Sequence, residues 1–157
     1  MPPTVYIETS VIGYLAMRLS HDLVTAAAQT VTRDWWETRR AGFDLVASEV
    51  VREEIAAGDP DAAMDRLAIL AGLRLLDITD EIGVLADRLL AEGPLPARAK
   101  YDALHIATSA IHGVDYLLTW NCKHIANAAM RPSIERLCRL AGYEPPIMCT
   151  PQELLDG

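Results

Sequence analysis

Residues 4–15 have the sequence TVYIETSVIGYL and change from one type of periodicity to another along their length. Residues 4–7 are apolar, β-branched and aromatic, which is typical of a short buried strand. Thr9 and Ser10 then precede apolar residues at helical spacing, and a hydroxyl residue in that position favours a helix start. The stretch therefore predicts a strand that passes directly into a helix, which is the opening of an α/β unit.

The same alternation continues along the rest of the chain. Strands are expected at residues 4–7, 43–47, 73–76, 116–118 and 147–149. Helices are expected from about residue 10 and at residues 22–41, 48–57, 60–71, 80–91, 97–112, 121–130 and 132–140, with a terminal turn at 151–155. This order predicts a three-layer α/β/α sandwich with a central, mainly parallel sheet of four to five strands. Sheets of this kind bind ligands at the carboxyl ends of their strands, near the point where the strand order reverses.

Length and composition indicate a single globular domain over residues 1–157, with 51% hydrophobic residues and a net charge of −8. An acidic chain is poorly suited to metal-free, non-specific binding of nucleic acid, because such binding depends on cations that neutralise phosphates. The three cysteines form no CxxC pair, so we expect reduced thiols. No signal peptide and no apolar run of membrane-spanning length is evident. We therefore expect a cytoplasmic protein with no membrane association.

Four oxygen-bearing residues are expected where strands end or helices begin. Glu8 follows the first strand, and Asn121 follows the strand at 116–118. Glu54 lies on the inward, apolar face of its helix, and Asp102 lies near the start of a helix that is apolar nearly all round. A carboxylate on an apolar face is costly unless it is paired or binds a cation. Carboxylate and amide oxygens suit Mg²⁺ or Mn²⁺ better than zinc.

Each of these residues also has a simpler interpretation. Glu8 could be a surface charge that the helix dipole stabilises, and Glu54 could pair with a buried arginine. Thr119 or Asn121 could cap the next helix. His105, on the same helix as Asp102, is typical of a hydrogen-bonded core histidine rather than of a metal ligand.

The four segments together resemble the motifs of PIN domains. Residues 6–12 (YIETSVI) are similar to the opening motif of that family, and residues 102–107 (DALHIA) are similar to its most recognisable segment. Ser48 to Ile55 resembles the second acidic helix, and residues 118–121 (LTWN) resemble the strand end that carries the last acidic or amide residue. The resemblance covers essentially the whole chain. It implies a metal-dependent ribonuclease, most similar to the VapC-type toxins of type II toxin–antitoxin modules.

The resemblance also implies roles for individual residues. Glu8, Glu54 and Asp102 would hold Mg²⁺ or Mn²⁺, and Asn121 would complete the catalytic set. Three hydroxyls would surround these ligands: Thr9, Ser10 and Thr119. Three cations would contact phosphates of the RNA substrate: Arg98, Lys100 and Lys123. An antitoxin and a second copy of the chain, in a homodimer, would be its protein partners.

Two departures from the family pattern leave an alternative open. The first acid is Glu8 where the family usually has Asp, and the last position is the neutral Asn121. Three carboxylates suit one metal ion better than two. The alternative is a degenerate PIN module that binds RNA or protein without cleaving. An unrelated flavodoxin-like domain has less support, because no glycine-rich phosphate loop follows the first strand.

Trp35 and Trp36 lie in an arginine-rich segment near the end of the helix at 22–41. Neighbouring residues on a helix point about 100° apart, so we expect one tryptophan to face the core. We expect the other tryptophan to be exposed, and a role at an antitoxin or dimer interface is favoured over stacking on RNA bases.

Overall fold

The computed structural model describes residues 1–156. Its strands are β1 (Thr4–Ile7), β2 (Asp44–Ser48), β3 (Arg74–Leu76), β4 (Tyr116–Leu118) and β5 (Ile147–Cys149). Its helices are α1 (Thr9–Ala16), α2 (Leu23–Thr38), the 3₁₀ turn η1 (Arg40–Gly42), α3 (Glu49–Ala56), α4 (Pro60–Leu70), α5 (Asp80–Glu92), α6 (Lys100–Ile111), α7 (Arg131–Leu140) and α8 (Pro151–Leu155). None of these helices combines the length and apolarity that crossing a membrane requires.

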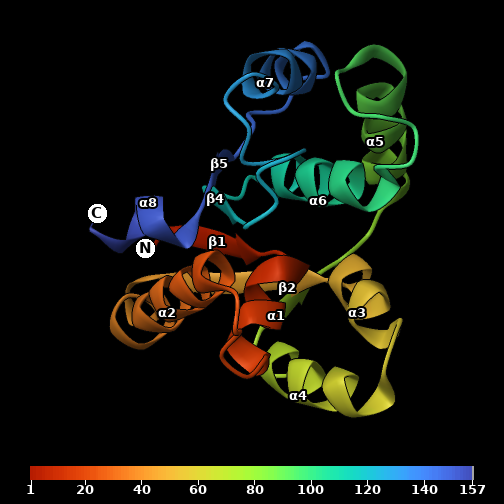
Figure 1. The fold of residues 1–157 in the computed structure, drawn as a ribbon. Helices are drawn as coiled ribbons and strands as arrows, with labels where there is room; N and C mark the ends of the chain where they lie inside the picture. The colour runs from red at the N-terminus through yellow and green to blue at the C-terminus, as the bar shows by residue number, and fades with distance from the viewer. Residues whose placement is uncertain (157) are drawn as a thin grey trace.

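The strands form one five-stranded sheet in the order β3-β2-β1-β4-β5, and every neighbouring pair is parallel. From β1 the chain builds outward to β2 and β3, and then crosses back to add β4 and β5 on the other side of β1. Because such crossovers keep one hand, the two halves place their helices on opposite faces. Figure 1 shows α5, α6 and α7 on one side of the sheet and α1 to α4 on the other. The expected three-layer α/β/α architecture and its parallel sheet are confirmed.

The strand β1 lies at the centre of the sheet and of the core. Val5, Tyr6 and Ile7 have no exposed surface, as expected for a central strand covered on both faces. The order of strands reverses between β1 and β4, so the carboxyl ends of these two strands flank the topological switch point. Whatever follows Ile7 and Leu118 therefore lies at the position where ligands bind in sheets of this kind.

Helices differ from the prediction by more than one residue in three places. The helix expected at residues 121–130 is a series of turns. There the side-chain oxygens of Asn121 and Asn127 accept hydrogen bonds from nearby backbone N–H groups, and such bonds compete with helix formation. The helix expected from residue 97 begins at Lys100, because Ala99 has a ψ of 42°, outside the helical range. The helix expected at 22–41 ends at Thr38 and is followed by η1.

Candidate functional site

The residues that follow β1 and β4 lie side by side at the carboxyl edge of the sheet. Glu8 follows β1 directly, and its backbone N–H donates to Leu118 O at the end of β4 (3.1 Å). Thr119 continues from β4 and is fully buried. The first and last segments of the predicted site, which are more than 100 residues apart in sequence, therefore meet at the switch point.

Glu8 is a buried carboxylate held by two hydroxyls. Its side chain is only 4% exposed. Its Oε1 accepts hydrogen bonds from Ser10 Oγ and from Thr119 Oγ1, the second at 2.6 Å. The same two hydroxyls accept from the backbone N–H groups of Trp120 and Asn121, both at 2.9 Å. Ser10 and Thr119 thus fix Glu8 and the loop after β4 in one arrangement.

Glu54 reaches the same edge from α3 and has a histidine as its partner. Its Oε1 accepts from Thr9 Oγ1 at 2.7 Å and from His105 Nε2 at 2.5 Å. The arginine that a buried Glu54 could have paired with is not its partner. Since Thr9 is on α1 and His105 is on α6, Glu54 ties together helices from both faces of the sheet.

Burial and pairing act in opposite directions on this pair. Burial by itself would raise the pKa of Glu54, but its hydrogen bond to His105, the charge of His105 and the Thr9 hydroxyl together lower that pKa below its usual value. Burial would likewise lower the pKa of His105. The hydrogen bond that His105 donates to Glu54 and the negative charges of Glu8, Glu54 and Asp102 outweigh burial and raise the pKa of His105. The pair is therefore favoured as carboxylate and imidazolium.

Asp102 lies in the first turn of α6, and both of its oxygens have partners. Oδ1 accepts from Asn121 Nδ2 at 2.9 Å, and Oδ2 is 2.8 Å from His124 Nδ1. Asn121 Oδ1 in turn accepts from the backbone N–H of His124 at 3.0 Å. Asn121 therefore uses both ends of its amide to hold Asp102 and the loop. His124 was missed by sequence reasoning, since only its position three residues after Asn121 hints that it shares this turn.

The donor set fits a hard divalent cation. Ligand atoms of Glu8, Glu54 and His105 lie within 4.8 Å of one another. Both nitrogens of His105 are engaged in hydrogen bonds, whereas within residues 1–156 every hydrogen bond to the side-chain carboxylate of Glu8 or Glu54 falls on Oε1. The Oε2 atoms of both glutamates are thus available as oxygen ligands of the type that Mg²⁺ or Mn²⁺ prefers. Asp102 is not in this group, but an ionised carboxylate has about four acceptor positions, so its two bonds leave room for a ligand role.

The expected phosphate-binding residues are exposed. Arg98, Lys100 and Lys123 all have exposed side chains, and none of them forms an ion pair with another described residue. Lys100 begins the helix that carries Asp102, and Lys123 lies in the loop that carries Asn121. Their positive charges are thus available to a substrate near the carboxylates.

The tryptophan pair divides as expected. Trp35 is fully buried and its ring stacks on Phe43 with ring centroids 5.7 Å apart. Trp36 is half-buried, and the guanidinium of Arg40 lies 4.6 Å from its ring centroid. Only Trp36 remains accessible in part to a partner.

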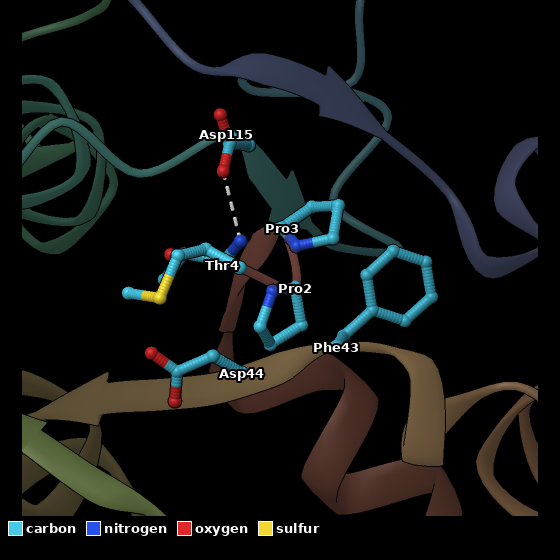
Figure 2. Close-up of a pocket in the computed structure, with 7 residues that line it drawn as sticks. Pro2, Pro3, Thr4, Phe43, Asp44 and Asp115 are labelled. Atoms are coloured by element: carbon cyan, nitrogen blue, oxygen red, sulfur yellow. Dashed lines mark hydrogen bonds between the residues drawn. The ribbon is translucent and has the colours of Figure 1, made fainter.

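A hollow lies at the opposite, amino edge of the sheet (Figure 2). Its carboxylates are already engaged, because Asp115 Oδ2 accepts from the backbone N–H of Thr4 at 2.9 Å and Asp44 pairs with Arg74 at 2.6 Å. The remaining lining residues are Met1, Pro2, Pro3 and Phe43. Because both carboxylates already have a partner and most of the remaining lining is apolar, this hollow is a poorer candidate for chemistry than the acidic edge.

The all-parallel sheet with helices on both faces defines a PIN-like α/β/α fold, with a cluster of acidic residues at its switch point. The crystal structure of VapC20 from Mycobacterium tuberculosis, a sarcin–ricin loop cleaving toxin, matches this chain with a TM-score of 0.60. The match covers 90% of this chain and 99% of that chain at 16% sequence identity. No protein-family model and no curated protein matches the sequence. The resemblance to PIN domains is thus confirmed for the fold.

Proposed function

We propose that this chain is an Mg²⁺- or Mn²⁺-dependent endoribonuclease that acts as the toxin of a type II toxin–antitoxin pair. The observation that carries the proposal is the convergence of the acidic residues on one edge of the sheet. Ligand atoms of Glu8, Glu54 and His105 lie within 4.8 Å of one another, and hydrogen bonds connect Asp102 to Glu8. Asn121 bonds to Asp102 and to Thr119, and Thr119 bonds to Glu8. His105, one turn after Asp102, bonds to Glu54. VapC20, whose fold is similar, is a toxin that cleaves the sarcin–ricin loop, and this supports RNA as the substrate.

Glu8, Glu54 and Asp102 would hold the cation. A bound divalent cation would activate water and neutralise the charge that develops on the phosphate oxygens. Glu54, fixed by Thr9 and His105, would act as a ligand or would orient the attacking water. The water oxygen would bond to phosphorus and give up a proton, the P–O bond to the leaving ribose oxygen would break, and the leaving oxygen would take up a proton.

Asn121 would orient Asp102 instead of adding a fourth negative charge. Its amide nitrogen donates to Asp102, and its oxygen is already occupied by the backbone N–H of His124. A site with three carboxylates and one amide suits one tightly held cation. The cations Arg98, Lys100 and Lys123 would bind RNA phosphates, and a strongly acidic chain would depend on them and on the metal for its affinity.

Exposed apolar side chains support a protein partner. Leu23 and Val24 at the start of α2 are 85% and 80% exposed, and Leu19 in the preceding loop is 55% exposed. Clustered apolar exposure is typical of interaction surfaces. We include an antitoxin and a homodimer among the proposed partners, and cytoplasmic location among the expected properties.

The decisive experiment measures cleavage of structured and single-stranded RNA with added Mg²⁺ or Mn²⁺. Cleavage should stop with EDTA and in Asp102→Asn, and should persist in Asp87→Asn, which removes an exposed carboxylate on α5. Absence of cleavage by folded, metal-loaded protein on every RNA tested would refute the nuclease proposal.

The second candidate is a degenerate PIN module that binds RNA or protein without cleaving. It is favoured by the hydrogen bonds from Asn121 and His124 to both oxygens of Asp102, because these bonds compete with a metal ion for that carboxylate. Mn²⁺ titration separates the two functions. A binding-only module would show no Mn²⁺ affinity that depends on Glu8, Glu54 or Asp102, whereas the nuclease would lose affinity when any of them is neutralised.

A further inference from the structure

A chain of three buried polar side chains runs from the middle of the core to Glu54. Ser48 on β2, Tyr6 on β1 and His105 on α6 all have no exposed surface. Tyr6 Oη lies 2.7 Å from Ser48 Oγ and 2.7 Å from His105 Nδ1. The far nitrogen of His105 then meets Glu54 at 2.5 Å. This series of hydrogen bonds thus connects β2, β1 and α6 and ends on the carboxylate of Glu54.

The charge of Glu54 fixes the direction of its hydrogen bond with His105. An ionised carboxylate only accepts, so His105 Nε2 must carry a proton and donate to Glu54. If Nδ1 is also protonated, it donates to Tyr6 Oη, and the Tyr6 hydroxyl donates to Ser48. If Nδ1 is not protonated, Ser48 donates to Tyr6 and Tyr6 donates to Nδ1. In both cases every member is satisfied and Nε2–H faces Glu54.

The surroundings hold the imidazole ring in one orientation. Tyr6 and His105 form an edge-on aromatic pair with centroids 5.5 Å apart and an interplanar angle of 62°. Burial of a polar group without hydrogen-bond partners destabilises the fold, whereas apolar residues of similar size could fill this space without needing partners. Stability alone therefore gives little reason to bury this chain of polar groups.

We propose that Tyr6 and His105 are positioning residues that lock the carboxylate of Glu54 with Oε1 inward and Oε2 free for the cation. The inference rests on the proposed function, in which Glu54 holds the metal or orients the water. Thr9 supplies the second bond to Oε1, so the carboxylate is fixed from two sides. Partners that orient metal ligands in this way commonly affect metal affinity or activity by about 10–100-fold.

The test uses Tyr6→Phe, which removes one hydroxyl and keeps the ring, and two replacements of His105. In His105→Gln the amide nitrogen takes the place of Nε2, whereas His105→Leu removes the donor. We expect Tyr6→Phe and His105→Leu to weaken Mn²⁺ binding by about 10-fold or more, while His105→Gln restores most of it. Because the phosphate-binding cations are untouched, kcat on RNA should fall while KM changes little. Tyr116→Phe, on β4, is the matched control, because its hydroxyl has no hydrogen bond within residues 1–156.

A double-mutant cycle shows whether the effect passes through Glu54. In a Glu54→Gln background, Tyr6→Phe should change Mn²⁺ affinity by less than about twofold, since the group it positions has been neutralised. Unchanged Mn²⁺ affinity in both Tyr6→Phe and His105→Leu, or an equal loss with and without Glu54→Gln, would overturn the positioning role. Wild-type protein that binds Mn²⁺ without cleaving RNA would overturn the nuclease proposal alone, and wild-type protein that binds no Mn²⁺ would overturn both.

Discussion

Replacement of Thr119 by valine tests how strongly the loop after β4 depends on Glu8. The substitution keeps the shape of a fully buried side chain and removes its hydroxyl. The lost groups are a donor to Glu8 Oε1 at 2.6 Å and an acceptor for the backbone N–H of Asn121 at 2.9 Å. A hydrogen bond to a charged group contributes about 1.5–3 kcal/mol, and a buried polar group left without a partner costs about 1–3 kcal/mol. Since Ser10 still bonds to Glu8, we expect a total loss of about 3 kcal/mol.

The assay is urea unfolding followed by circular dichroism, with Thr108→Val as the matched control. Thr108 is also fully buried, but its hydroxyl only donates to the carbonyl oxygen of Leu104 within α6. Its loss should cost less than about 1 kcal/mol. Thr119→Val should also weaken Mn²⁺ binding by about 10-fold, because Asn121 then loses its anchor beside Asp102. If the two valine variants have unfolding free energies within about 0.5 kcal/mol of each other, the reasoning fails.

Three further predictions concern ionisable side chains. With the pKa of Glu54 lowered from 4.5 and that of His105 raised from 6.5, their pairing should stabilise the fold fully between about pH 4.5 and 6.5. That stability should be lost as pH falls through the lowered value or rises through the raised one, and urea unfolding across pH should show a flatter profile in His105→Gln. Asn121→Asp places a second carboxylate against Asp102, so the metal-free Tm should fall and the Tm increase on adding Mn²⁺ should grow; an unchanged Tm in both conditions would contradict this. Cys122 is exposed while burial raises the pKa of the other two thiols to about 11 and about 12, so a thiol reagent should modify one cysteine in the native protein and all three after unfolding.

The architecture was readable from sequence because its signals are local. Residues 4–15 show a strand period followed by a helix period, and the parallel arrangement follows from repeated alternation of that kind. The position of Glu8 and Asn121 after strands β1 and β4 followed in the same way. The turns at residues 121–130 were wrongly predicted as helix, because asparagine side chains there bond to the backbone in a manner that apolar spacing does not reveal.

The partners of the carboxylates were not readable in the same way. Tyr6 has the sequence signature of an apolar strand residue, yet its hydroxyl supports His105, which is 99 residues away. His124 gave no sequence signal of its own, yet its Nδ1 forms a hydrogen bond with Asp102 Oδ2. Hydrogen bonds between distant segments depend on where two backbones bring their side chains, and no periodicity within one segment carries that information.

The sequence by itself determined most of the secondary structure, the parallel α/β class and the acidic residues that gather at one edge, because each depends on periodicity and on the ends of strands. Only the tertiary structure decided how that acidity is held. It assigned His105 to Glu54, Asn121 and His124 to Asp102, and two hydroxyls to Glu8. The physical reason is that a buried carboxylate must be satisfied by donors, and the strand order, which brings β1 between β2 and β4, selects which donors reach it.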